Sequence, residues 1–232
     1  MGASLSMLVF QPPQVTYLQS KTQLIWLRTA QDSNIPAVFI DRKSKITMIF
    51  SHGNAEDIGC FYDSFCELAA EVGVNVLLYD YEGYGKATGQ PSEQGCYDCI
   101  DAAYQFLTIT LRIPSEQIVL YGRSLGSGPS CYLAERLHRE KKPLGGLILQ
   151  APLMSIFRVA FNFRFTLPYD MFANIDRIGG VGCPVFVIHG VKDEVVPFWH
   201  GQELFLAAPI ALRARPLWVE TGGHNNLEDL LV

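Results

Sequence analysis

Residues 119–129 read VLYGRSLGSGP, an apolar run that leads into a serine placed between two glycines. The segment from Gly122 to Gly126 matches the pattern G-x-S-x-G, in which a nucleophilic serine lies on a sharp strand-to-helix turn. A tight turn that only needs small residues would produce the same pattern. The sequence on either side decides between the two interpretations, because the motif indicates a nucleophilic serine only where a strand ends and a helix begins.

The rest of the chain alternates short apolar runs with amphipathic stretches. Strands are predicted at residues 22–29, 35–41, 46–51, 75–81, 117–122, 144–151, 183–190 and 215–220. Helices are predicted at residues 59–72, 93–111, 125–141 and 198–207. From residue 46 onward the strands are continuous apolar runs, typical of strands that are buried on both faces of a parallel sheet. The pattern predicts an α/β fold: a mostly parallel open sheet with helices on both faces and an antiparallel edge formed by the first two strands.

The bulk composition sets limits on function. The chain has 232 residues, which we interpret as one domain spanning residues 1–232. A net charge of −5 and the lack of a basic stripe exclude a nucleic-acid binder, and no apolar run reaches the roughly 18 residues that span a bilayer. We therefore expect a cytoplasmic protein. Cys96 and Cys99 form C-x-x-C within a predicted helix but lack a second pair, so no metal site is expected.

The nucleophile interpretation requires a base and an acid, because a serine hydroxyl is a poor nucleophile until its proton is removed. In folds with this turn the chain order is serine, acid, histidine. Asp193 follows the strand VFVIHG, His224 follows the strand PLWVE, and ligands bind at such carboxyl ends of strands. We predict the triad Ser124, Asp193 and His224. The rival acids are Glu194, Asp170 and Asp176. Of the other histidines, His189 and His52 are expected to be buried hydrogen-bonding residues, His200 a packing or surface residue, and His138 a solvated one.

Acyl transfer also needs two hydrogen-bond donors for the developing oxyanion. The N–H of Leu125, directly after the serine, is the first candidate. The second is expected in the loop HGNA that follows the strand ITMIFS, at the N–H of Asn54 or alternatively of Ala55.

The segment at about 153–180 interrupts the alternation and is rich in phenylalanine. It predicts helices that pack on the core, a short cap over an apolar pocket, or both. Phe157, Phe161 and Phe165 are the candidate pocket residues.

Six stretches, HGNAED, DYEGYGKATGQPSE, LYGRSLGSGP, APLMS, HGVKDEVV and PLWVETGGHNN, occur in this order between about residue 10 and the C-terminus. Together they resemble the α/β-hydrolase fold, and more narrowly the α/β-hydrolase domain-containing protein 17 group of protein depalmitoylases. The resemblance implies triad roles for Ser124, Asp193 and His224, oxyanion roles for Asn54 and Leu125, and substrates that are S-acylated cysteines on membrane-associated proteins.

Both ends of the chain differ from that group. The group carries an N-terminal cysteine cluster that anchors it to membranes, whereas here no cysteine precedes Cys60. The start MGASLS fits a myristoylation pattern at Gly2, or consists of residues left by cloning. We expect at most weak peripheral association with the cytosolic face of membranes. The eight residues after His224 would supply only the first two turns of the helix that usually closes the fold, which we expect to be truncated.

These observations predict a serine hydrolase that cleaves acyl thioesters or esters through an acyl-enzyme, without a cofactor or a metal. A palmitoyl-protein thioesterase is the leading interpretation. The alternatives are a carboxylesterase or monoacylglycerol-type lipase, a serine peptidase on the same fold, and a non-catalytic binding module. The oligomeric state is left open.

Overall fold

The computed structural model describes residues 9–17, 23–161 and 167–227. The chain divides into two compact units, Met1–Val119 and Leu120–Val232, and each is described by itself. All eight predicted strands are present, each within three residues of its predicted ends. The interpretation as one domain stays a prediction.

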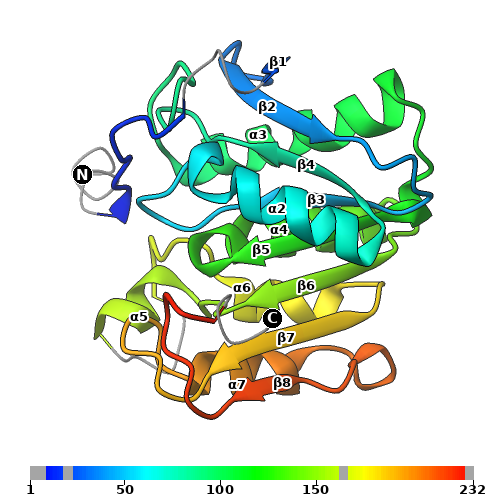
Figure 1. The fold of residues 1–232 in the computed structure, drawn as a ribbon. Helices are drawn as coiled ribbons and strands as arrows, with labels where there is room; N and C mark the ends of the chain where they lie inside the picture. Colours follow the sequence, from blue (N-terminus) through cyan, green and yellow to red (C-terminus); the bar gives the residue numbers. More distant parts are fainter. Residues whose placement is uncertain (1–8, 18–22, 162–166, 228–232) are drawn as a thin grey trace. The chain divides into compact units, whose positions relative to one another are not determined.

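The strands of the first unit are β1 (Ile25–Arg28), β2 (Asn34–Ile40), β3 (Thr47–Ser51) and β4 (Asn75–Tyr79). They lie in the order β1-β2-β4-β3 (Figure 1). β2 is antiparallel to both β1 and β4, whereas β3 and β4 are parallel. The predicted antiparallel edge is therefore confirmed, and every residue of β3 and β4 is buried, as their continuous apolar runs predict.

Two helices pack against these strands, α2 (Ile58–Val72) and α3 (Glu93–Gln105). The carboxylate of Asp57 caps α2 by accepting the N–H of Gly59, and Gly73 ends it in the left-handed conformation (φ 69°) that favours glycine. Ser92 caps α3 through the N–H of Gly95. The predicted helix 93–111 ends in a π-helical turn, Phe106–Thr110, and a 3₁₀ turn, Ser115–Gln117, leads to the next strand.

The strands of the second unit are β5 (Ile118–Arg123), which begins at the end of the first unit, β6 (Gly146–Gln150), β7 (Val185–Gly190) and β8 (Leu217–Val219). β6 and β7 are parallel, as are β7 and β8. A 3₁₀ turn (Ser124–Gly126) and α4 (Ser127–Arg139) follow β5, α7 (Trp199–Ala207) packs against β7, and a short 3₁₀ turn (Ile210–Leu212) precedes β8.

The segment predicted as a cap carries only short helices: α5 (Ile156–Phe161), α6 (Asn174–Arg177) and a 3₁₀ turn, Ile178–Gly180. α6 contacts both α4 and α7. Phe172 and Asn174 are fully buried, so part of the segment belongs to the core of the unit. The core-packing interpretation is confirmed for this part, and the cap function stays a prediction.

Candidate active site

Ser124 lies on a strained turn between β5 and α4. Its φ angle is +51°, in the left-handed region that residues with a side chain rarely adopt, and a strain of this kind is characteristic of functional sites. The turn also requires glycine at position 122, because a Cβ there would lie 2.5 Å from the carbonyl oxygen of Gly126 and 2.7 Å from the hydroxyl of Ser130. The strand-to-helix turn predicted for the G-x-S-x-G motif is therefore present.

The predicted base and acid lie in contact with this serine and with each other. Nε2 of His224 is 3.1 Å from Oγ of Ser124, and Nδ1 of His224 is 2.8 Å from Oδ2 of Asp193. Asp193 comes from the loop after β7, and His224 comes from the loop after β8. All three residues are more than nine-tenths buried. The structure thus brings together, from three separate loops, the residues that the sequence pattern selected.

Asp193 is held in its charged form. Its Oδ1 accepts the N–H groups of Val195 (2.9 Å) and Val196 (2.7 Å), and its Oδ2 faces His224 and also Nε2 of His189, at 3.3 Å. Burial alone would raise the pKa of this carboxyl, but hydrogen bonds from His189 and His224 and from the Val196 N–H outweigh it and lower the pKa well below its usual range. A carboxylate that is fully ionised fixes the histidine ring with its Nδ1 protonated and its Nε2 free to accept a proton.

His189 touches the candidate acid. It is fully buried, as predicted, and its Nε2 lies 2.9 Å from the carbonyl oxygen of Val196, so Nε2 carries the ring proton. The same N–H also points toward Oδ2 of Asp193. Sequence reasoning missed this contact. The only signal for it was the spacing of four residues between His189 and Asp193.

The rival acids make other contacts. Glu194 is exposed and its Oε2 accepts the backbone N–H of His224 at 3.4 Å. Asp170 accepts the N–H of Phe157 at 2.9 Å and lies 3.7 Å from the buried Arg158. Only Asp193, among the described acidic side chains, is placed against the His224 ring.

Two buried side chains that the sequence did not point to support the site. The guanidinium of Arg123 donates to the carbonyl oxygen of His224 (3.2 Å) and to Oδ1 of Asn225 (3.1 Å), which ties the histidine loop to the end of β5. Asn174 donates to the hydroxyl of Ser127 (3.0 Å), which in turn donates to the carbonyl oxygen of Ser124 (2.6 Å). These bonds fix the backbone on both sides of the serine.

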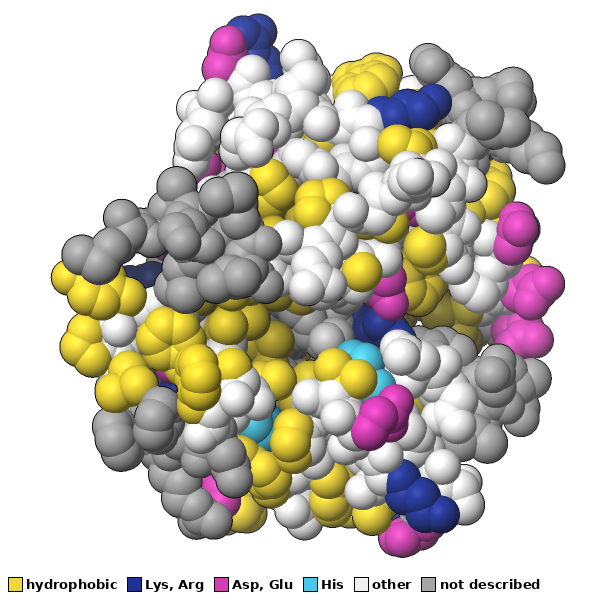
Figure 2. Space-filling model, turned by 90° about the vertical axis from the view of Figure 1, so that its left-hand side faces the viewer, with side chains coloured by type: hydrophobic (Ala, Val, Ile, Leu, Met, Phe, Trp, Pro, Cys, Tyr) yellow, Lys and Arg dark blue, Asp and Glu magenta, His cyan; other side chains and the backbone are white. Residues whose placement is uncertain are grey.

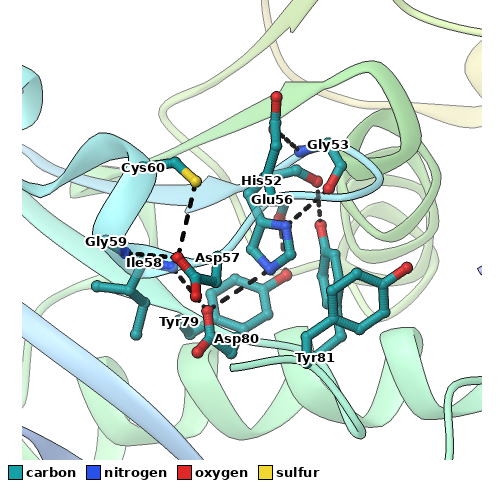
Figure 3. Close-up of polar contacts among 12 residues, drawn as sticks. His52, Gly53, Glu56, Asp57, Ile58, Gly59, Cys60, Tyr79, Asp80 and Tyr81 are labelled. Carbon is teal, nitrogen blue, oxygen red and sulfur yellow. Dashed lines mark hydrogen bonds and ion pairs between the residues drawn. The ribbon is translucent and has the colours of Figure 1, made fainter. Parts of the chain in front are cut away.

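The two candidate oxyanion donors lie in different units. Leu125 is buried and directly follows Ser124 at the start of the 3₁₀ turn. Asn54 lies in the loop after β3, in a turn where Ala55 adopts φ +56°. In this loop the His52 ring contacts the Gly53 carbonyl oxygen at 2.8 Å, and the Gly53 N–H donates to Glu56 at 2.6 Å (Figure 3). The oxyanion role of both N–H groups stays a prediction.

The structure describes Phe157 and Phe161, two of the three candidate pocket residues. The rings of Phe157 and Phe161 meet edge to face with centroids 6.1 Å apart, and Phe161 is 63% exposed. Phe165 lies outside the described residues. Figure 2 shows hydrophobic side chains gathered on the lower left of one face, with histidine surface beside them. The role of Phe157, Phe161 and Phe165 in binding an acyl chain stays a prediction.

The described part of the chain contains neither a candidate metal site nor a helix that could span a membrane. No group of three or more His, Cys, Asp or Glu side chains within residues 9–17, 23–161 and 167–227 could hold a metal ion. None of the helices in those ranges has both the length and the hydropathy to cross a bilayer.

Comparison with known proteins identifies the class. Residues 42–169 match the family model described as serine aminopeptidase, S33. A solved structure of an esterase from Pyrococcus furiosus superposes with a TM-score of 0.73 over 95% of this chain and 93% of that chain, at 19% identity. That likeness shows the fold, and fold and family model together place the chain among the α/β serine hydrolases.

Curated relatives narrow the class to one family. Mouse alpha/beta hydrolase domain-containing protein 17C is 41% identical over 209 residues, which are 89% of this chain and 63% of the mouse protein. The Xenopus tropicalis protein 17B is 40% identical over 204 residues, which are 87% of this chain and 68% of the frog protein. The chain belongs to the alpha/beta hydrolase domain-containing protein 17 family, and it spans less than two thirds of the length of the mouse relative.

Proposed function

We propose that the chain hydrolyses acyl thioesters or esters through an acyl-enzyme on Ser124. The observation that supports this is the unbroken contact from Oγ of Ser124 through the His224 ring to Oδ2 of Asp193, at 3.1 Å and 2.8 Å. A non-catalytic binding module would have no need for this contact, nor for a strained serine at φ +51°.

The reaction begins when Nε2 of His224 takes the hydroxyl proton of Ser124 and Oγ attacks the acyl carbonyl carbon. Asp193 keeps the imidazole in the required tautomer and stabilises the imidazolium that forms. The tetrahedral intermediate then collapses, the C–S or C–O bond breaks, and His224 returns the proton to the leaving sulfur or oxygen. Water repeats the sequence on the acyl-enzyme and releases the carboxylic acid, so no cofactor is consumed.

The oxyanion of both tetrahedral intermediates is proposed to accept the N–H groups of Leu125 and Asn54. Leu125 follows the nucleophile directly, and its N–H lies at the N-terminal end of the turn that continues into α4. In enzymes with oxyanion donors, loss of one donor costs about 100- to 1000-fold in kcat, so these two groups would contribute a large share of the rate.

The proposed substrate class is the S-acylated cysteine of a protein at the cytosolic face of a membrane. Membership of the family supports this, because the resemblance to that group implies S-acylated cysteines on membrane-associated proteins as substrates. Thioester cleavage is compatible with this site, because a thiol with a pKa near 8.5 leaves readily as the thiolate and needs little protonation by His224. Phe157 and Phe161 offer apolar surface for a long acyl chain, with at most weak peripheral contact between enzyme and membrane.

A peptide substrate is less well supported. The matched family model is described as a serine aminopeptidase, but the match ends at residue 169, before Asp193 and His224. An amine is a poorer leaving group than a thiolate and needs a better-placed acid to protonate it. Oxygen esters remain the closer rival, because the same three residues serve both leaving groups.

The first experiment is labelling with a fluorophosphonate probe, read by intact mass, on the parent chain and on Ser124→Ala. The expected result is one added probe mass on the parent and none on the variant. The ratio of kcat/KM for a palmitoyl thioester to that for the matching oxygen ester and for an aminoacyl anilide then ranks the three substrate classes. A folded parent that does not label would refute the proposal.

A further inference from the structure

The segment of residues 9–17 lies against the loop that carries the proposed oxyanion donor Asn54, although more than 40 residues separate the two in sequence. The contacts between them are hydrogen bonds that fall into two sets. One set is made by the side chain of Asn54, and the other by the carboxylates of Asp57 and Asp80. All of these residues belong to the first unit.

The side chain of Asn54 is fully engaged with the segment and its surroundings. Its Nδ2 donates to the carbonyl oxygen of Val9 at 2.7 Å. Its Oδ1 accepts the N–H of Gln11 (3.0 Å), the hydroxyl of Tyr84 (2.6 Å) and the N–H of Ala55 (3.1 Å). The last bond fastens the residue with φ +56°, a conformation that persists only where the surrounding contacts enforce it. A side chain used in this way is positioning its own backbone.

Asp57 and Asp80 anchor the other end of the segment. Asp57 accepts the N–H of Thr16 at 2.8 Å and also the Thr16 hydroxyl, while it caps α2 through Gly59. Asp80, fully buried at the end of β4, accepts the hydroxyl of Tyr17 at 2.5 Å and the N–H of Ile58 at 2.8 Å. Figure 3 shows the two carboxylates side by side below the start of α2, directly after the loop.

We propose that segment 9–17 is a positioning element that fixes the backbone of residues 53–58, and with it the N–H of Asn54, in the geometry required for oxyanion binding. This inference rests on the proposed function. The physical reason is that a strained loop relaxes when its outside contacts are lost, and a donor must lie within about 0.5 Å of its place to stabilise a transition state. None of the residues in segment 9–17 is proposed to touch substrate, so the segment acts only through the loop.

The test uses full-length variants that remove contacts but leave the Asn54 N–H in place. Tyr17→Phe removes the hydroxyl bond to Asp80 and the acceptor of the Lys86 N–H. Asn54→Ala removes the side-chain bonds to Val9 and Gln11, together with those to Tyr84 and Ala55. Tyr104→Phe is the matched control, because this buried tyrosine loses a comparable 2.8 Å bond, to Ser115, that does not involve the loop. Fluorophosphonate labelling counts active sites, so kcat is expressed per labelled site and separated from any loss of folded protein.

We expect kcat per site for a p-nitrophenyl ester to fall about tenfold in Tyr17→Phe and further in Asn54→Ala, with KM within about twofold of the parent. The control variant Tyr104→Phe should keep the kcat of the parent, even if its melting temperature falls as much as that of Tyr17→Phe. Thr16→Val, which loses the hydroxyl contacts with Asp57 and with the sulfur of Cys60 but keeps the N–H bond to Asp57, replaces Tyr17→Phe if that variant gives little folded protein. Unchanged kcat per site in both loop variants, or an equal fall in the control, would overturn the inference.

Amide hydrogen exchange separates this inference from the proposed function. The amides of Gly53, Ala55, Ile58 and Gly59, which donate hydrogen bonds within this region, should be protected in the parent, lose protection in Tyr17→Phe and keep it in Tyr104→Phe. The same protection in all three proteins would refute the positioning role whether or not Ser124 is reactive. If Tyr17→Phe loses protection but the parent does not label at Ser124, the result would support the contact while refuting its catalytic purpose.

Discussion

Replacing Asp80 by asparagine should remove a pH dependence of stability that the structure builds in. Burial raises the pKa of this carboxyl to about 7, against the opposing effect of the hydrogen bonds from Tyr17 and from the N–H of Ile58, and the nearby charge of Asp57 raises it further. The His52 ring, 3.7 Å away, is the other titratable group beside it. In the unfolded chain the same carboxyl has its ordinary pKa of 3.8.

The sign follows from the higher pKa in the folded state. The folded protein keeps the proton of Asp80 to higher pH than the unfolded chain does, so the stabilising contribution is complete below about pH 4 and is lost as the pH rises through 7. With 1.36 kcal/mol per unit, the shift from 3.8 to about 7 corresponds to at most about 4 kcal/mol, of which about 3 kcal/mol falls between pH 5 and pH 8.

Urea unfolding of the parent and of Asp80→Asn at pH 5 and pH 8 measures this directly. Asparagine keeps an acceptor for the Ile58 N–H and does not titrate. The free energy of unfolding of the parent should drop by about 3 kcal/mol more than that of the variant between the two pH values. Equal pH dependence in the two proteins, with unchanged m-values, would show that Asp80 is already ionised at pH 5 and would refute the reasoning.

Three further outcomes are expected. His189→Phe removes an N–H directed at Asp193 and should lower kcat per fluorophosphonate-labelled site about tenfold, the value of one hydrogen bond to a charged group; unchanged kcat would contradict this. Gly122→Ala would place a Cβ 2.5 Å from the Gly126 carbonyl oxygen and should reduce the free energy of unfolding in urea by about 1–3 kcal/mol, whereas an unchanged midpoint would show that the turn can relax. Phe161→Ala should lower kcat/KM for palmitoyl relative to butyryl esters several-fold; an unchanged ratio would exclude Phe161 from the acyl site.

The strands and helices were predictable because their signals are local. Continuous apolar runs placed β3 and β4 in the interior, and the amphipathic stretch from residue 93 predicted the start of α3. The end of α3 was less predictable, because a π-helical turn continues the same apolar periodicity and differs only in its hydrogen bonds. Residue patterns report which face of an element is buried, and they do so well.

The candidate triad was predictable for a different reason. In a parallel sheet the carboxyl ends of the strands lie at one edge, so the chain order of Ser124, Asp193 and His224 was enough to suggest that they meet. Contacts that depend on the path of a loop were missed. His189 reaches Asp193 only because the turn after β7 folds back on itself, and Tyr17 reaches Asp80 across 63 positions of sequence. No periodicity encodes such contacts.

Two buried aspartates show how the local supply of donors decides whether a carboxyl keeps its charge. Asp193 faces the N–H groups of two valines and the rings of two histidines, and its pKa is lowered despite burial. Asp80 receives one hydroxyl and one N–H, too few to offset burial, and its pKa rises to about 7. A permanent anion suits the residue that must orient and stabilise a protonated His224 during each proposed turnover. A pKa of about 7 suits Asp80, which only has to accept hydrogen bonds. Its carboxyl fixes the backbone without placing a second permanent negative charge beside Asp57.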